Sequence, residues 1–421
     1  MAMQEISISI LPADRPDYLA VELTGIPKDA SEGDKQQIDV YLTLRFHEVW
    51  QNFMEGRFKF SIKGGEIKLK LENSQMLQQS PQKSPSQGTS ENAKAIACHV
   101  RLGRSQTEPS WIFVFDRAVP SGSLKNFPLG TIQINNFPCI IRAAFDIAIN
   151  DVQLTDFEGL WRHDIHPNKH AVLERKLAIS LVNSSLKPHL LDRPIILEYK
   201  SPETITSINN YEIEKLPTVS PEINTVIHQV IAAKTENFID LAKIAQLNPT
   251  EDFYGANLIA VDLAETDLSG VNFSRVNLRG ADLSDADLTE ANLSNANLGG
   301  ADLSGALLSD ANLAGADLHK CSVALANLSG ANLNKANLQE ANLSNANLSD
   351  ADLSDANFKN ADLYRARLVL TNLAGTNLMD AKVEEARFRH DSGLSEDLVK
   401  NLQQRGAIFE EPEICQKPID Y

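Results

Sequence analysis

The sequence predicts an all-β protein in two parts: a coil of short stacked strands in the C-terminal half, and an antiparallel, sandwich-like β domain before it. Three observations predict this. An apolar residue stands at every fifth position from Phe253 to Phe388, apolar and polar residues alternate over much of residues 1–215, and helical spacing is confined to short segments beside the repeats. With 421 residues, 43 % of them hydrophobic, the chain is long and apolar enough for more than one core.

The repeat defines the C-terminal part. From Phe253 to Phe388, 28 consecutive positions at a spacing of five are Leu, Phe or Val, and a small residue, mostly Ala, stands two positions before each. In an α-helix five residues advance a side chain by roughly 140°, so the leucines would scatter around the helix. In a strand, residues two apart point to the same side, and the extra residues can turn a corner. Each pentad therefore predicts one wall of a coil with Leu at its axis.

The motif A(D/N)Lxx of residues 253–388 resembles the pentapeptide-repeat family. The resemblance implies a right-handed quadrilateral β-helix over residues 251–390, with four pentads in each coil and about seven coils in all. The segments AKTENFIDLAKIAQLNPTEDFYGANL and GLSEDLVKNLQQRGAIF are similar to segments that flank the repeats in cyanobacterial members. The resemblance therefore suggests a cyanobacterial source.

With four pentads to a coil, residues twenty apart stack in columns. Two asparagine columns, one with Asn257, Asn277 and Asn297 and one with Asn272, Asn292, Asn312 and Asn332, are expected to form amide ladders. Acidic residues instead gather near the start of the repeats: Asp262, Asp267, Asp282, Asp285, Asp287 and Asp302. Such a stripe either only confers solubility or meets a basic partner or cations.

The other end of the repeats is basic, and Arg367 and Arg387 share a column. Apolar residues also interrupt the polar positions between these ends: Leu307, Leu325, Val369, Leu370 and Met379. Isolated exposed apolar residues are common on proteins, but Leu325 and Leu370 could instead mark an interface. We therefore take Leu325, Leu370, Arg367, Arg387 and the acidic stripe as the candidate partner surface.

Helices are expected to cover the open ends of the coil. Residues 220–248 predict a helical linker and N-terminal cap, since Ser220, Pro221 and Glu222 form a helix start and 237–247 is amphipathic. Residues 394–409 predict a C-terminal capping helix and strand, opened by Ser395 and closed by Gly406.

Residues 1–215 predict the β-rich domain, with roughly ten strands, of which residues 173–182 are expected to form one. Lys63 to Glu66, KGGE, predicts a hairpin turn. A Ser-, Gln- and Pro-rich insertion predicts a disordered loop at 74–93.

Composition limits the function. The net charge of −17 argues against direct binding of nucleic acid through its phosphates. No leader and no membrane-spanning stretch is recognisable, so a cytoplasmic location is expected. The four scattered cysteines, Cys98, Cys139, Cys321 and Cys415, predict reduced thiols in place of a disulfide framework or zinc knuckle.

The cluster WRHDIHPNKH is the one candidate for chemistry. His163, Asp164, His166 and His170 are the residue types that bind zinc or another transition metal, but their spacing matches no known motif, and Pro167 and Asn168 indicate a surface turn. No catalytic motif is present, so no enzyme activity and no cofactor are predicted.

Three functional hypotheses follow from the sequence. The leading one is a non-enzymatic scaffold whose rigid repeats present flat walls to another protein, with the N-terminal β domain as a binding or regulatory module; a second copy of the chain, forming a homodimer, is one candidate partner. The second is an acidic mimic of DNA, because some members of the family resemble a duplex and occupy the DNA-binding surface of a type II topoisomerase. The third makes residues 1–215 a binder of small molecules or glycans.

Overall fold

The chain divides into two compact units, residues 1–162 with 177–224, and residues 163–176 with 225–421. The computed structural model describes residues 6–9, 19–28, 36–48, 50–53, 56–79, 98–103, 108–119, 121–136, 139–162, 164–183, 193–201, 204–208, 222–389 and 392–410.

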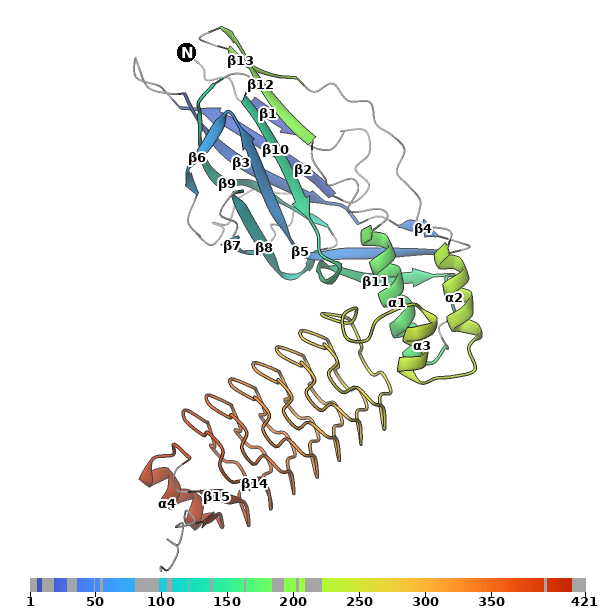
Figure 1. Ribbon diagram of the computed structural model, residues 1–421, viewed down its shortest axis with the longest axis vertical. Helices are drawn as coiled ribbons and strands as arrows, with labels where there is room; N and C mark the ends of the chain where they lie inside the picture. The colour runs from blue at the N-terminus through green and yellow to red at the C-terminus, as the bar shows by residue number, and fades with distance from the viewer. Residues whose placement is uncertain are drawn as a thin grey trace, which may run out of the picture. The chain divides into compact units, whose positions relative to one another are not determined.

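The first unit is built from two antiparallel sheets (Figure 1). The smaller has the order β1-β2-β3-β9-β6: β1 Ile6–Ser9, β2 Leu19–Pro27, β3 Gln37–Phe46, β9 Gly122–Ile134 and β6 Ser74–Gln79. The larger has the order β13-β12-β10-β5-β8-β7, with β11 and β4 also paired to β5: β13 Thr204–Ile208, β12 Arg193–Ser201, β10 Cys139–Asp146, β5 Gly56–Glu72, β8 Ser110–Val119, β7 Cys98–Leu102, β11 Val152–Glu158 and β4 Gln51–Phe53.

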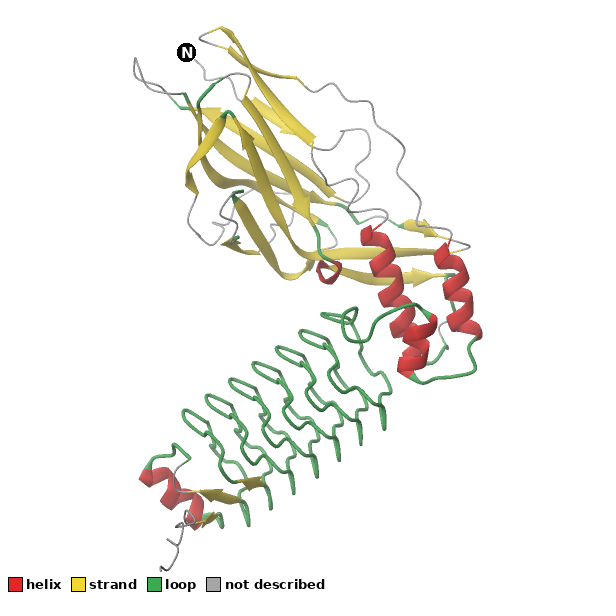
Figure 2. Ribbon diagram, in the orientation of Figure 1, coloured by secondary structure: helices red, strands yellow, loops and turns green. Residues whose placement is uncertain are grey.

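Both sheets bury the apolar half of their alternating strands. In β3, Val40, Leu42 and Leu44 are buried, and in β5 and β8 the same is true of Phe58 and Trp111. Because successive side chains of a strand point to opposite faces, this alternation gives each sheet one apolar face. The strand content of this unit is plain in Figure 2.

The predicted hairpin at KGGE is wrong, because β5 runs through it as one strand of 17 residues. The two glycines serve close packing. A Cβ atom at Gly64 would lie 2.5 Å from the carbonyl oxygen of Phe113, and one at Gly65 would lie 2.6 Å from the ring of Phe145. Glycine inside a strand can mark such a close approach as well as a turn.

The disordered loop predicted at 74–93 begins too early. Residues Ser74–Gln79 form β6, which pairs with β9 and places Met76 opposite Ile132. Pairing with β9 gives the backbone of these residues hydrogen-bond partners, which the polar composition of the segment does not reveal. Residues 80–93 lie outside the described part of the chain.

The strand predicted at 173–182 is also wrong, since Pro167–Leu181 form the α-helix α1. Leu173, Leu177 and Leu181 are buried and stand four residues apart. This is the spacing of one helix face, and it outweighs the short alternation in LERKLAISLV. The 3-10 turn η1, Ile149–Asp151, precedes β11.

In the second unit, three further helices flank the repeats: α2 Glu222–Ala232, α3 Phe238–Ile244 and α4 Glu396–Gln404. The side chain of Asn237 caps α3 by accepting from the Asp240 N–H, and Ser395 caps α4 by accepting from the Leu398 N–H. Gly406 follows α4 with φ +92°, a conformation that favours glycine at a helix end. Within the described residues, none of the helices has the length and hydrophobicity needed to cross a bilayer.

Residues 253–388 form a β-helix-type solenoid of stacked coils (Figure 1). Parallel bridges join residues twenty apart, such as Asn257 with Asn277, so one turn takes four pentads. All 28 residues of the apolar fifth-position series are buried, as is nearly every small residue two positions before them. The predicted axis of leucines is therefore confirmed.

Aromatic rings close both ends of the solenoid. Phe238 of α3 lies 4.8 Å, centroid to centroid, from Phe253 of the first pentad. At the other end Phe409, from β16 Ile408–Glu410, stacks on Phe388 at 5.3 Å. β16 pairs in parallel with β15 Arg387–Arg389, which pairs with β14 Arg367–Leu368. The last coil thus has no open strand edge there, which removes a route to aggregation.

Cys321 gives a probe of this core. It is buried at a small-residue position, and burial raises the pKa of its thiol, so the reactive thiolate is scarce. We expect Cys321 to resist iodoacetamide in the native protein at mildly alkaline pH and to react once the solenoid unfolds, as read by peptide mass spectrometry. Native labelling at the rate of a free peptide thiol would contradict a closed core.

Candidate protein-interaction surface

The twenty-residue period divides the solenoid surface into four walls. We name them by their first pentads: wall 1 from 256–260, wall 2 from 261–265, wall 3 from 266–270 and wall 4 from 271–275, each continuing every twenty residues. A column is a set of residues twenty apart on one wall. Because stacked strands lie about 4.8 Å apart, each column is a ladder of side chains at that spacing.

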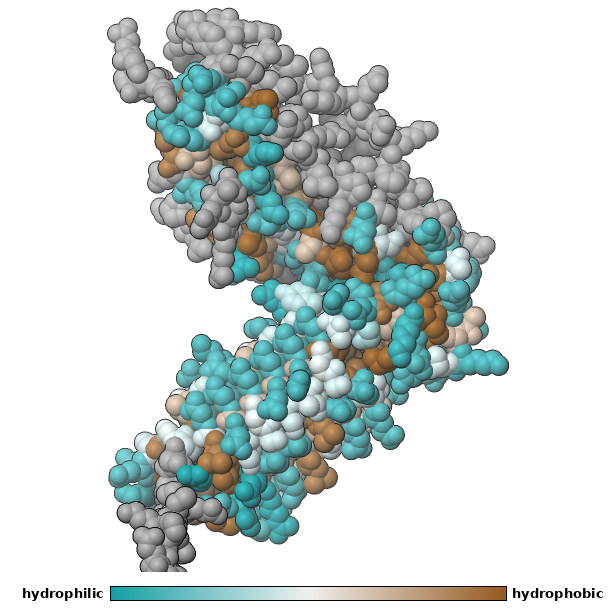
Figure 3. Space-filling model, viewed as in Figure 1, coloured by the Kyte–Doolittle hydropathy of each residue, from teal (hydrophilic) through white to brown (hydrophobic). Residues whose placement is uncertain are grey.

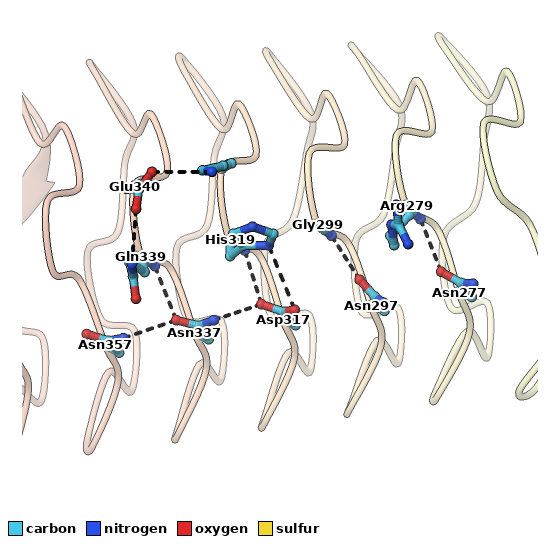
Figure 4. Close-up of polar contacts among 11 residues, drawn as sticks. Asn277, Arg279, Asn297, Gly299, Asp317, His319, Asn337, Gln339, Glu340 and Asn357 are labelled. Carbon is cyan, nitrogen blue, oxygen red and sulfur yellow. Dashed lines mark hydrogen bonds and ion pairs between the residues drawn. The ribbon is translucent and has the colours of Figure 1, made fainter. Parts of the chain in front are cut away.

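The polar residue before each core leucine holds the backbone turn that follows it. In wall 1, the Oδ1 atoms of Asn297 and Asp317 accept from the N–H groups of Gly299 and His319, two residues on (Figure 4). Between coils, Asn337 Nδ2 donates to Asp317 Oδ1 at 2.8 Å. Two contacts of the predicted amide ladders are confirmed: Asn277 Nδ2 donates to Asn257 Oδ1, and Asn312 Nδ2 donates to Asn292 Oδ1.

The predicted aspartate columns form in the same way. Bridges stack Asp262 on Asp282 and Asp282 on Asp302 in wall 2, and Asp267 on Asp287 in wall 3. Each accepts through Oδ1 from the N–H two residues on, for example Asp282 from Ser284 at 3.0 Å. These turns use one oxygen of each carboxylate, and asparagine would serve them equally well. The negative charge is therefore not needed for the fold.

We call the acidic residues of walls 2 and 3 in the first three coils the acidic face. It consists of Asp262, Glu265, Asp267, Asp282, Asp285, Asp287, Glu290, Asp302 and Asp310, and the same pentads hold no lysine or arginine. Within the described residues, none of these nine carboxylates forms an ion pair. Hydrogen bonds from the Ser269 hydroxyl and N–H lower the pKa of Asp267, which keeps it charged.

The far end of the same two walls is basic, but its charges are partly paired. Arg365 Nε lies 2.7 Å from Glu385 Oε2, and Lys382 Nζ lies 3.1 Å from Asp362 Oδ2. Arg367 and Arg387 stack through a parallel pairing, as the sequence indicates. Arg367 donates to the Ser349 hydroxyl at 3.0 Å, and Arg387 lies 3.4 Å from Glu410.

Exposed leucines lie between and beside these charged ends. Leu325 is 70 % exposed, Leu370 is 52 % exposed and Leu307 is 45 % exposed, whereas Val369 is buried. Leu325 and Leu370 occupy the last position of their pentads, where φ is positive, at +63° and +64°. Most other last positions hold Gly, Asn, Asp, Glu, Lys or Arg. Figure 3 shows the solenoid surface as mostly hydrophilic with separate hydrophobic patches.

The described residues of the candidate metal cluster lie at and just before the start of α1. Among the described residues no three His, Cys, Asp or Glu side chains gather as metal ligands, and His163 is not among the residues described. His166 lies 3.7 Å from Glu236, and His170 lies 3.8 Å from Glu174. Asp164 is exposed. His166 and His170 therefore lie beside two different glutamates.

Asn168 is not in a surface turn as predicted, because it is buried, with 2 % of its surface exposed. Its Oδ1 accepts from the Asp262 N–H at 2.9 Å, and its Nδ2 donates to the Asp262 carbonyl and to the Glu236 carbonyl. In later coils the N–H at this position donates to the preceding coil, as Asp282 does to Val261. The side-chain amide of Asn168 thus makes the hydrogen bonds to the Asp262 backbone that a preceding coil would otherwise make.

Arg175 of α1 makes a second tie to the start of the solenoid. Its guanidinium donates to the carbonyl oxygens of Asp252 and Tyr254. Burial lowers the pKa of Arg175 to about 10, and the charges of Asp252 and Glu174 oppose that shift. The sequence places Asn168 in a surface turn and gives no separate signal for Arg175, and only the helical spacing of the leucines in α1 could have placed both residues on a helix.

Comparison with known proteins assigns the repeats to a family. The family model described as pentapeptide repeats matches in eight copies within residues 252–289, 286–323, 325–360 and 356–390. HetL, a pentapeptide repeat protein involved in heterocyst differentiation regulation from the cyanobacterium Nostoc sp. strain PCC 7120, is 33 % identical over 32 % of this chain and 83 % of its own, with a TM-score of 0.14.

Two further solved structures are similar to about a third of this chain. Rfr23 from the cyanobacterium Cyanothece 51142 is 29 % identical over 31 % of this chain and 86 % of its own, with a TM-score of 0.17. QnrB1, a plasmid-mediated fluoroquinolone resistance protein, is 18 % identical over 38 % of this chain and 93 % of its own, with a TM-score of 0.17. The search of curated proteins found no match.

Proposed function

This chain belongs to the pentapeptide-repeat family through residues 252–390, and from that premise we propose that it is a non-enzymatic scaffold that binds another protein through walls 2 and 3 of the solenoid. The domain plan that accompanies this proposal is a sandwich-like β domain in residues 1–215 as the binding or regulatory module, a helical linker and cap at 220–248, about seven coils at 251–390 and a capping helix and strand at 394–409. A cytoplasmic location and a cyanobacterial source remain predictions from the sequence.

The acidic face is the observation that carries the proposal. Like charges about 4.8 Å apart repel by about 0.9 kcal/mol per pair even in water, so a column of three aspartates costs stability. The turns do not require the charge, since asparagine fills the same position in walls 1 and 4. A charged column that the fold does not need is best explained by a basic surface on a partner, which such a field attracts and orients.

A mimic of DNA is less well supported by the charge distribution. A duplex carries one negative charge for about every 1.7 Å along its whole length. Here the acids without an ion pair are densest in the first coils of walls 2 and 3 and sparser beyond them, while Arg365, Arg367, Lys382 and Arg387 lie at the far end of the same walls. A gyrase supercoiling assay at high protein excess should therefore show no inhibition.

Neutralising one column tests the scaffold. In the triple variant Asp262→Asn, Asp282→Asn and Asp302→Asn, every turn keeps its Oδ1 acceptor while three charges are removed. We expect stability to rise by about 1–2 kcal/mol, because two like-charged contacts disappear. Crosslinking mass spectrometry in the native cell should show loss of the partner peptides that wild-type walls 2 and 3 capture.

A matched control removes the same charge elsewhere. Asp352→Asn, Asp355→Asn and Asp380→Asn neutralise three acids on walls 4 and 1, and the last two keep a residue type that tolerates positive φ. This control should capture the partner as the wild type does. Equal capture by both triple variants would reduce the acidic face to a solubility feature and overturn the proposed function.

A further inference from the structure

One column of wall 3 changes sign from end to end. Its residues at intervals of twenty, which we call the reversal column, are Asp267, Asp287, Leu307, Asn327, Asn347, Arg367 and Arg387. Two acids occupy one end, two arginines occupy the other, and uncharged side chains lie between. Because the column is straight and evenly spaced, reversing it end for end about Asn327 places each aspartate opposite an arginine.

The corner column beside it has the same centre. It runs Glu265, Asp285, Gly305, Leu325, Asn345, Arg365 and Glu385, and its middle residue is Leu325. A two-fold axis along the strand direction at this level would place Leu325 against Leu325 of the second copy and Asp285 against Arg365. In this arrangement Glu265 would face Glu385, which carries the same charge. The repulsion is reduced because Arg365 already forms an ion pair with Glu385.

Leu325 has no evident role in the stability of a single solenoid. It is 70 % exposed, and its φ of +63° is strained for a leucine. Its neighbours across wall 3 are small: Ser309 and Ser329 follow the core leucines of their pentads. Small side chains beside a projecting leucine let a second flat wall approach closely.

Arg367 and Arg387, the arginines of the reversal column, can give up their present partners and pair with aspartates of a second copy. Arg367 hydrogen-bonds only a serine hydroxyl in the described residues, and the ion pair of Arg387 with Glu410 is half-exposed. Exposed ion pairs of this kind hold their partners weakly. Among the described residues, Asp267 and Asp287 accept hydrogen bonds only from their own turns.

We propose that two copies of this chain associate antiparallel through wall 3, with Asp267 of each facing Arg387 of the other, Asp287 facing Arg367, and the two Leu325 side chains meeting at the two-fold axis. This inference rests on the proposed function and names the partner of walls 2 and 3 as a second copy. A two-fold interface uses each contact twice, so the two Asp–Arg pairs become four. A parallel arrangement would face aspartate with aspartate and is disfavoured by the same charges.

Reciprocal charge exchange in the full chain tests the arrangement. The variants Asp267→Arg with Asp287→Arg, and Arg367→Asp with Arg387→Asp, use residue types that this column already carries. Sedimentation velocity at low salt should show a dimer for the wild type, and for each double variant a dissociation constant raised by roughly tenfold or more. The quadruple exchange, and a mixture of the two double variants, should restore the dimer.

A zero-length crosslink fixes the register. With Arg387→Lys, a carbodiimide should join residue 387 of one copy to Asp267 of the other in a mixture of isotopically light and heavy protein. Within one copy these residues are six coil steps apart, about 29 Å, so the crosslink cannot form internally. Lys382 is the matched control: it lies on wall 2, and it should give no inter-copy crosslink to Asp267.

The outcomes separate this inference from the scaffold proposal. A wild type that stays monomeric at high concentration and low salt overturns the dimer, as does a quadruple exchange that fails to reassociate although circular dichroism shows it folded. In either case, loss of a different captured protein in the Asp262, Asp282 and Asp302 triple variant would still support the scaffold. High salt should weaken the wild-type dimer, since its pairs are exposed.

Discussion

Leu328→Ala is expected to destabilise the solenoid by about 2–5 kcal/mol, while Leu325→Ala, three residues earlier, should leave its stability nearly unchanged. Leu328 has no exposed surface and fills the axis, so its loss leaves a cavity that a closed coil cannot collapse. Leu325 is mostly exposed and buries little in the isolated chain. Urea unfolding, followed by the rate at which Cys321 becomes reactive to alkylation, measures both.

A third variant sharpens this comparison. Leu325→Asn should stabilise the solenoid slightly, because asparagine tolerates the positive φ at this corner better than leucine. The same variant should weaken self-association. If Leu328→Ala and Leu325→Ala lowered stability equally, the division between axis and surface on which the fold rests would be wrong.

Asn168→Ala is expected to open the first coil. The substitution leaves the N–H and C=O of Asp262 and the carbonyl of Glu236 without their side-chain partner, at about 1–3 kcal/mol for each buried group that water does not reach. Hydrogen exchange should therefore quicken in peptides from residues 256–275 and stay unchanged near residue 330. Exchange that quickens evenly along the solenoid would contradict a local role for Asn168.

Two controls accompany this prediction. Asn168→Asp keeps an acceptor for the Asp262 N–H but loses the donor and places a charge beside two carbonyls, so the first coil should remain open. Lys243→Ala alters an exposed side chain of α3 whose ion pair with Asp240 is solvated and should change nothing measurable.

The sequence was most informative where structure repeats and least where it depends on distant contacts. The five-residue period predicts the axis, and the four-pentad turn that the family resemblance implies predicts the columns and the stacking of Asp262 on Asp282, because each coil repeats the same local geometry. Local caps predict α4 through Ser395 and Gly406. These signals are short-range, so one chain suffices to find them.

The failures have the opposite character. Gly64 and Gly65 resemble a turn, but their role is set by Phe113 and Phe145 on neighbouring strands. Asn168 bonds to a backbone 94 residues away, and nothing near it in the chain announces that partner. The alternation in LERKLAISLV predicts a strand because a window of ten residues partly fits both the two-residue period of a strand and the 3.6-residue period of a helix.

The twenty-residue turn has a consequence for how such a surface can change. Deleting or inserting a whole turn would shorten or lengthen the stack and leave every downstream side chain on its own side. A change of one pentad would instead rotate everything after it by a quarter turn and carry Arg367 and Arg387 to an adjacent side, away from Asp267 and Asp287. An insertion of one pentad in this protein would therefore alter binding by rotating the downstream binding residues around the solenoid axis, while the leucine core stays intact.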